Sequence, residues 1–277
     1  YCSHNCGSFA QQSYFSIIML HDMAQRHDVW PNIWAHEPWD KFDIGILPGN
    51  EWFKRWEISQ KYPCANPRYG MYKLGWPKSD NIFRSYFKQE VEQLKNHLNL
   101  KYKQSVLYAP SWENDDKQDK FIQALKKLRI NLIIKQAPWS ENYPEILKNI
   151  KDMRDKHYNM ADHIYLLEPE LDIMKCIGIS DVIVSDESSV MLEGLLFDVP
   201  SISVNDWLIP DQNPPRPPVA PFDFIIKTTT AELTNIVSEI LSNLPKHQTK
   251  IKNEKENMFS NLGQSAIKIM DCIDQYI

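Results

Sequence analysis

The residues best suited to chemistry follow the apolar run DVIVS at 181–185. Such a run predicts a buried parallel strand, and parallel α/β sheets bind ligands where a strand ends and the next helix begins. Asp186, Ser188 and Ser189 lie at that turn. The hydroxyl groups of Ser188 and Ser189, together with backbone N–H groups, can donate hydrogen bonds to a pyrophosphate. The segment therefore predicts a phosphate-binding turn.

One helical turn further along the chain stands a second candidate, Glu193. Its carboxylate can accept hydrogen bonds from ribose hydroxyls, which suits a nucleotide whose phosphates lie at the helix start. A simpler interpretation is equally concrete: Asp186, Ser188 and Ser189 only cap the helix, and Glu193 is solvated. The residues alone leave both interpretations open.

Other nucleotide-binding signatures are missing from the sequence. It has no GxxxxGK followed by Ser or Thr, no GxGxxG and no GxSxG, and it contains only eight glycines in 277 residues. The sequence therefore lacks the motifs that usually indicate a P-loop ATPase, an NAD enzyme or an α/β-hydrolase. A phosphate site here must be made from hydroxyls and helix N-termini.

The composition is that of a folded protein, with 43% hydrophobic and 24% charged residues. The net charge of -5, without a dominant basic run, argues against nucleic acid as a partner. Five scattered cysteines indicate a reducing cytoplasm rather than a disulfide framework. No apolar run approaches the roughly 20 residues of a membrane helix. We expect no metal site and no resident cofactor.

From residue 105 onward, short apolar runs alternate with segments of helical period, which predicts βαβ units and a parallel sheet. The expected strands are 105–109, 131–135, 163–167, 181–185 and 201–204. The expected helices are 116–129, 143–157, 170–177, 189–197, 230–244 and 261–277. The segment 207–221 carries six prolines and is interpreted as a rigid loop, with a ligand for an SH3-like partner as the alternative.

The first hundred residues show the same alternation of strands and helices less clearly. The expected strands lie in 14–20, 44–47 and 71–74, and a helix is expected at 82–98. The polar stretch 99–104 predicts a hinge near residue 100. We expect an α/β protein of two Rossmann-like lobes, 1–100 on the acceptor side and 101–277 on the donor side. Because the chain starts at Tyr1 rather than Met, we expect the first lobe to lack an upstream region.

Several of these segments resemble one family. The run ISDVIVSDESSVMLEGLLFDVPSI at 179–202 is similar to the donor-site signature of the CDP-glycerol glycerophosphotransferases, which build the glycerol-phosphate polymers of teichoic acids and some capsules. Further similar elements, in the same order and spacing, are FDIGILPGNEWFKRW at 42–56, KLGWPKSD at 73–80 and VLYAPSW at 106–112. The resemblance covers most of the chain from about 14 to 205.

The resemblance implies a GT-B fold, with a cleft between the lobes and a nucleotide-activated donor bound mainly by the second. It implies transfer of glycerol phosphate, or a related polyol phosphate or sugar, from a CDP-linked donor to a hydroxyl of a cell-surface polymer. Ser111, Asp186, Ser188, Ser189 and Glu193 would bind the donor, although the family usually has Asp where Glu193 stands. A cytoplasmic location is implied, peripheral at the inner membrane face if the acceptor is lipid-linked.

The resemblance also assigns catalytic groups. His21 matches a family histidine proposed as the base that takes the acceptor proton, and Asp22 could orient it. A structural hydrogen-bonding role for His21 is the alternative. Lys135 matches a family cation that can stabilise phosphate charge. Ala137 stands where the family carries a second histidine, which keeps two alternatives open: a UDP- or GDP-sugar transferase or epimerase, and a non-catalytic nucleotide-binding homologue.

Overall fold

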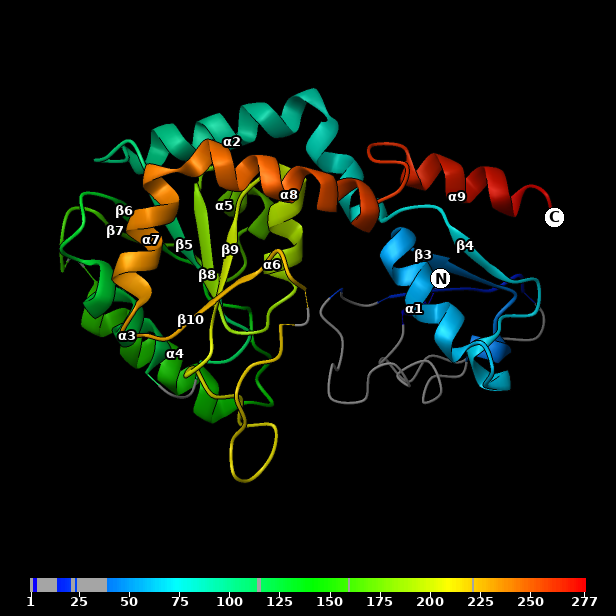
Figure 1. Ribbon diagram of the computed structural model, residues 1–277, viewed down its shortest axis with the longest axis horizontal. Helices are drawn as coiled ribbons and strands as arrows, with labels where there is room; N and C mark the ends of the chain where they lie inside the picture. Colours follow the sequence, from blue (N-terminus) through cyan, green and yellow to red (C-terminus); the bar gives the residue numbers. More distant parts are fainter. Residues whose placement is uncertain are drawn as a thin grey trace. The chain divides into compact units, whose positions relative to one another are not determined.

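A computed structural model describes residues 2–3, 14–20, 23, 39–113, 116–158, 160–220 and 222–277. The chain forms two compact units, Tyr1–Ser85 with Asn253–Ile277 and Tyr86–Lys252 (Figure 1). Each unit is built on its own parallel sheet. The predicted fold class, α/β with parallel sheets, is confirmed.

The sheet of the second unit has the strand order β10-β9-β8-β5-β6-β7. Its strands are β5 (Ser105–Tyr108), β6 (Asn131–Ile134), β7 (Ile164–Leu166), β8 (Val182–Ser185), β9 (Ser201–Val204) and β10 (Ile226–Thr228). The chain runs outward from β5 to β7, then returns to the other side of β5 and continues from β8 to β10. The carboxyl ends of β5 and β8 therefore flank a topological switch point, where sheets of this kind bind ligands.

Helices cover both faces of this sheet, which explains its almost continuous apolar strands. On one face, the strand side chains cluster with α3 (Lys117–Leu125) and α7 (Leu233–Ser242). The other face carries α6 (Val190–Glu193), which is preceded by α5 (Ile173–Gly178) and followed by Gly194. A Cβ at Gly194 would lie 2.7 Å from the Cδ1 atom of Ile183 in β8. The helix therefore approaches the sheet as closely as glycine permits.

The other helices of this unit are α2 (Ser85–Leu98), α4 (Pro144–His157) and most of α8 (Leu244–Met258). The predictions of β5 to β9, α2, α3, α4, α5 and α7 are confirmed to within a few residues, whereas β10 and α8 were not predicted. The expected helix 189–197 is instead the four-residue α6 and a 3-10 turn, Gly194–Phe197. Asp198 ends that turn in the left-handed conformation, which reverses the chain towards β9. The proline-rich segment is a loop, as predicted.

The first unit contains a parallel sheet in the order β1-β2-β3-β4. Its strands are β1 (Cys2–Ser3), β2 (Ile17–Met19), β3 (Ile44–Leu47) and β4 (Met71–Lys73), and α1 (Asn50–Ser59) follows β3. The C-terminal helix α9 (Ser265–Ile273) packs Ile269 and Cys272 against Met19, Ile44 and Ile46. The carboxylate of Asp80 accepts hydrogen bonds from the N–H groups of Ser265, at 3.0 Å, and Ala266, at 2.8 Å. These bonds cap α9.

This packing corrects the predicted division of the chain. Residues 253–277 belong to the first unit, although sequence order places them after the second lobe. The division also falls at Ser85 rather than near residue 100, because α2 packs on the second unit: Phe87 lies 6.0 Å from Phe197, measured between ring centroids. Among the described residues, no helix has the length and apolarity needed to cross a membrane.

Gly75 provides a test of how the C-terminal segment joins the first unit. Its φ is +98°, and a Cβ would lie 2.3 Å from the Ser265 Oγ atom and 2.4 Å from the Ser260 carbonyl oxygen. We expect Gly75→Ala to lower the free energy of unfolding by about 2 kcal/mol, measured by urea denaturation. Gly70 is the matched control, since its φ is +111° but a Cβ there would lie no closer than 4.0 Å to a neighbouring side chain, that of Tyr72. An equal decrease in the free energy of unfolding for the two glycine variants would show that the close contact of Gly75 with Ser260 and Ser265 does not contribute to stability.

Candidate functional site

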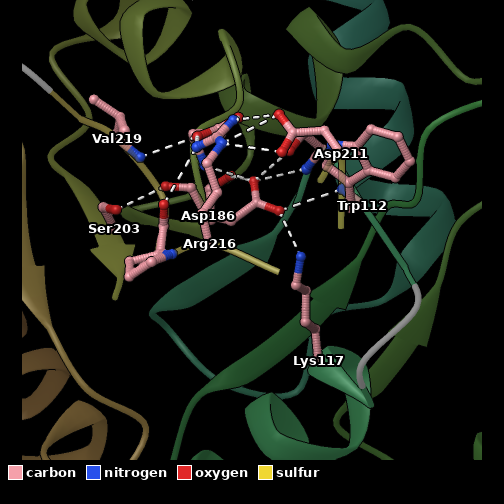
Figure 2. A network of polar contacts seen from close by, with 11 residues as sticks. Trp112, Lys117, Asp186, Ser203, Asp211, Arg216 and Val219 are labelled. Atoms are coloured by element: carbon pink, nitrogen blue, oxygen red, sulfur yellow. Dashed lines mark hydrogen bonds and ion pairs between the residues drawn. The ribbon is translucent and has the colours of Figure 1, made fainter. Parts of the chain in front are cut away.

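Asp186 lies at the end of β8, at the switch point, and is fully buried. Its Oδ1 atom accepts hydrogen bonds from the N–H and the hydroxyl of Ser111, both at 2.8 Å. Its Oδ2 atom accepts from the Trp112 N–H at 3.2 Å. Ser111 and Trp112 follow β5, so one carboxylate ties together the two chain segments that leave the switch point (Figure 2).

The charge of Asp186 is balanced by Lys117, the first residue of α3. The Lys117 Nζ atom donates to Asp186 Oδ2 at 2.9 Å, and both side chains are 0% exposed. Buried charges persist when they are paired and hydrogen-bonded, because either group alone would be costly to desolvate. Sequence reasoning missed this lysine. Its spacing of four residues from Phe121 places it on the buried stripe of α3 and could have revealed it.

A second buried carboxyl group directly follows Ser111 and Trp112 in the chain. Glu113 is fully buried, and the hydroxyl of Tyr108 donates to its Oε2 atom at 2.8 Å. Burial raises the pKa of Glu113 to about 8, against the lowering effects of the hydrogen bond from Tyr108 and the charge of Lys117. At neutral pH this carboxyl group is therefore mostly protonated. No spacing or motif in the sequence distinguishes it from an exposed glutamate.

The turn after β8 differs in part from the simpler sequence interpretation, in which its residues only cap the helix and Glu193 is solvated. The Ser188 Oγ atom accepts a hydrogen bond from the Val190 N–H at 3.3 Å, whereas Ser189 stands at the N-cap without a side-chain cap bond. Glu193 is 2% exposed, so the solvated alternative is wrong for this residue. Because α6 has only four residues, its dipole is small. Phosphate binding at this turn would therefore depend on local hydroxyl and N–H groups.

Comparison with known proteins identifies the family. The sequence profile of the CDP-glycerol:poly(glycerophosphate) glycerophosphotransferases matches residues 55–274. The chain belongs to this family. No protein among those with curated descriptions matches the sequence.

Solved structures of other proteins share the fold. The wall teichoic acid polymerase TagF matches with a TM-score of 0.62 and 16% identity, over 96% of this chain and 68% of that one. A TagF variant matches with a TM-score of 0.58 and 18% identity, over 87% of this chain and 60% of that one. Anabaena Alr3699/HepE in complex with UDP-glucose matches with a TM-score of 0.53 and 13% identity, over 94% of this chain and 72% of that one. These likenesses show the GT-B fold, and the chain spans roughly 60 to 70% of the TagF chains.

The structure gathers five of the donor-site residues predicted from the family resemblance at one place. Ser111 and Asp186 are in direct contact, and Ser188, Ser189 and Glu193 follow within the same turn and helix. The hydroxyl proton of Ser111 is directed at Asp186, so Ser111 positions the turn in this arrangement. The contacts of these residues with a donor stay predictions.

Lys135 lies at the same edge of the sheet, two strands from β8. It is 4% exposed, and its Nζ atom donates to the carbonyl oxygens of Pro169, at 2.6 Å, and Gln136, at 3.0 Å. The lysine therefore joins the loops after β6 and β7, and its contact with phosphate stays a prediction. His21, expected as the base that takes the acceptor proton, and Asp22, expected to orient it, lie outside the described residues. No three His, Cys, Asp or Glu side chains cluster as a metal site within the described part of the chain.

Proposed function

We propose that this protein transfers glycerol phosphate from CDP-glycerol to a hydroxyl group of a cell-surface polymer. Membership of the glycerophosphotransferase family supports the reaction. The observation that carries the proposal is the site at the switch point, where Asp186 fixes the Ser111 turn beside Ser188 and Ser189. One TagF structure was obtained with a CDPG soak, which fits a CDP-linked donor for a protein of this fold.

In the proposed reaction, the acceptor oxygen attacks the phosphorus that carries glycerol. A new P–O bond forms, the bond to the bridging oxygen of the diphosphate breaks, and CMP leaves. His21 takes the hydroxyl proton and Asp22 orients it. The Ser188–Ser189 turn binds the diphosphate. Asp186 holds this turn in its binding conformation before the substrate arrives, so the turn can stabilise the transition-state charge without reorganising. We propose a polymer or lipid-linked acceptor, used at the inner face of the membrane.

Nucleotide binding tests the donor site. Calorimetry and thermal shift with CDP-glycerol, CDP, CMP, UDP-GlcNAc and a GDP-sugar should show selective binding of the CDP compounds. We expect Ser188→Ala to weaken CDP-glycerol binding by about tenfold or more, as for loss of a hydrogen bond to a charged group. Glu193→Gln should weaken it through loss of the ribose contact, and it keeps the volume of this buried side chain better than alanine would.

Ser180→Ala is the matched control for Ser188→Ala. The Ser180 hydroxyl donates to the Cys176 carbonyl at 2.7 Å, and the residue lies before β8, at the opposite end of the strand. This variant should bind CDP-glycerol as the wild type does. Preference of the wild type for a UDP- or GDP-sugar would instead favour the sugar-transfer alternative. Equal effects of the two serine variants on binding would show that the Ser188 turn is not part of the donor site.

A further inference from the structure

The proline-rich loop is anchored beside the turn after β8. We call residues 207–220, which follow β9, the strap. Trp207 and Ile209 at its start are fully buried, and Ala220 at its end is 4% exposed. Its two arms meet in an antiparallel bridge, in which Ile209 and Arg216 exchange N–H···O bonds of 2.7 and 3.0 Å. The strap is therefore a closed loop held at both ends by the second unit.

One guanidinium group connects the strap to the turn. Two N–H groups of Arg216 donate to the two carboxylate oxygens of Glu187, each at 2.7 Å. The same group makes bonds of 2.7 to 3.2 Å with both oxygens of Asp211. The N–H of Val219 adds a further bond to Glu187 at 3.0 Å (Figure 2). The hydrogen bonds that Arg216 donates to Glu187, and to a smaller extent those to Asp211, raise the pKa of Arg216 above its ordinary value, so it stays charged.

The charges of this network affect any anion that binds nearby. Glu187 directly precedes Ser188, so it belongs to the turn that would bind phosphate. Arg216 supplies one positive charge against the two negative charges of Glu187 and Asp211. Without the guanidinium group, both carboxylates would lose their positive partner, and Glu187, whose side chain is only 16% exposed, would repel a diphosphate at the adjacent residues with limited solvent screening. The Arg216 side chain is only 17% exposed.

We infer that Arg216 is a positioning and specificity-determining residue for an anionic nucleotide donor. It holds the strap against the turn after β8 and neutralises Glu187, so that this turn accepts phosphates instead of repelling them. The inference rests on the proposed function, because it takes the Ser188 turn as the place where the donor diphosphate binds. The strap is then part of the donor site and not a connection between elements.

The test is CDP binding by calorimetry, with limited proteolysis of the strap as a second measurement. Arg216→Gln should weaken CDP binding by about tenfold and expose the strap to cleavage. Adding Glu187→Gln should restore most of the affinity, because the repelling carboxylate is gone, while the strap stays susceptible to cleavage. Asp211→Asn keeps the Arg216–Glu187 pair and should bind CDP as tightly as the wild type or more tightly.

Arg154→Gln is the matched control. Arg154 is of similar exposure, 20%, and pairs with Glu168, but it contacts the segment after β7, at the far edge of the sheet. This variant should bind CDP normally. If wild-type protein binds CDP and Arg216→Gln binds it equally well, or if the double variant is no better than Arg216→Gln, the inference is wrong and the proposed function stands. If wild-type protein binds no CDP compound, both are overturned.

Discussion

Asp186→Ala should lower the free energy of unfolding by about 3–5 kcal/mol, measured by urea denaturation, because it leaves the ammonium group of Lys117 buried without its carboxylate. Both side chains are 0% exposed in the native protein. The variant also removes the acceptor for the Ser111 and Trp112 N–H groups. The variant should therefore destabilise the turns at the switch point as well as α3, and it should no longer bind the donor.

Two variants separate this effect from a general loss of charge. Asp162 pairs with Lys101 on the surface, where its side chain is 71% exposed, and Asp162→Ala should change the free energy of unfolding little. Combining Asp186→Asn with Lys117→Met removes both buried charges and should recover part of the stability lost in Asp186→Ala. A cost for Asp186→Ala no greater than that for Asp162→Ala would contradict the role given to the buried pair.

Glu113→Gln should remove a large part of the pH dependence of stability. The native pKa of about 8 lies above the ordinary value of 4.5, so between these pH values the folded protein holds a proton that the unfolded chain has released. The contribution of protonated Glu113 to the free energy of unfolding is therefore largest below about pH 4.5. It decreases by about 1.4 kcal/mol per pH unit as the pH rises towards 8. A neutral glutamine has no such dependence.

The measurement is urea denaturation of the wild type and Glu113→Gln from pH 5 to pH 8. We expect the stability of the wild type relative to the variant to fall by about 3 kcal/mol over this range. Glu168→Gln is the control, since the Glu168 side chain is 75% exposed, and its difference from the wild type should change little. Parallel stability curves for the wild type and Glu113→Gln would mean that Glu113 is ionised in the native protein at neutral pH.

The sequence predicted the parts of the fold that depend on local pattern. The strands around 105–109 and 181–185 were found because burial on both faces of a parallel sheet makes them continuously apolar. Their carboxyl ends carry Ser111 and Asp186, and the strand order then brings these residues together. The location of the candidate site thus followed from strand pattern and polar residues at strand ends.

The sequence did not reveal features set by contacts between distant residues. Arg216 and Glu187 are 29 residues apart, and neither stands in a pattern that indicates its partner. Glu113 and Lys117 are polar residues whose usual place is the surface, so their burial contradicts the ordinary preference. The return of α9 to the first unit depends on Asp80, which caps a helix that begins 185 residues later.

The most direct test of the central claim is CMP release from CDP-glycerol by the purified protein, with and without a poly(glycerol phosphate) primer. We expect primer-dependent release of CMP, with one glycerol phosphate added to the primer for each CMP formed. Ser188→Ala should lose this activity and Ser180→Ala should keep it. Binding of CDP-glycerol without any primer extension would contradict the transferase and indicate a nucleotide-binding protein. Glucosyl transfer from UDP-glucose, with no reaction of CDP-glycerol, would contradict the proposed donor.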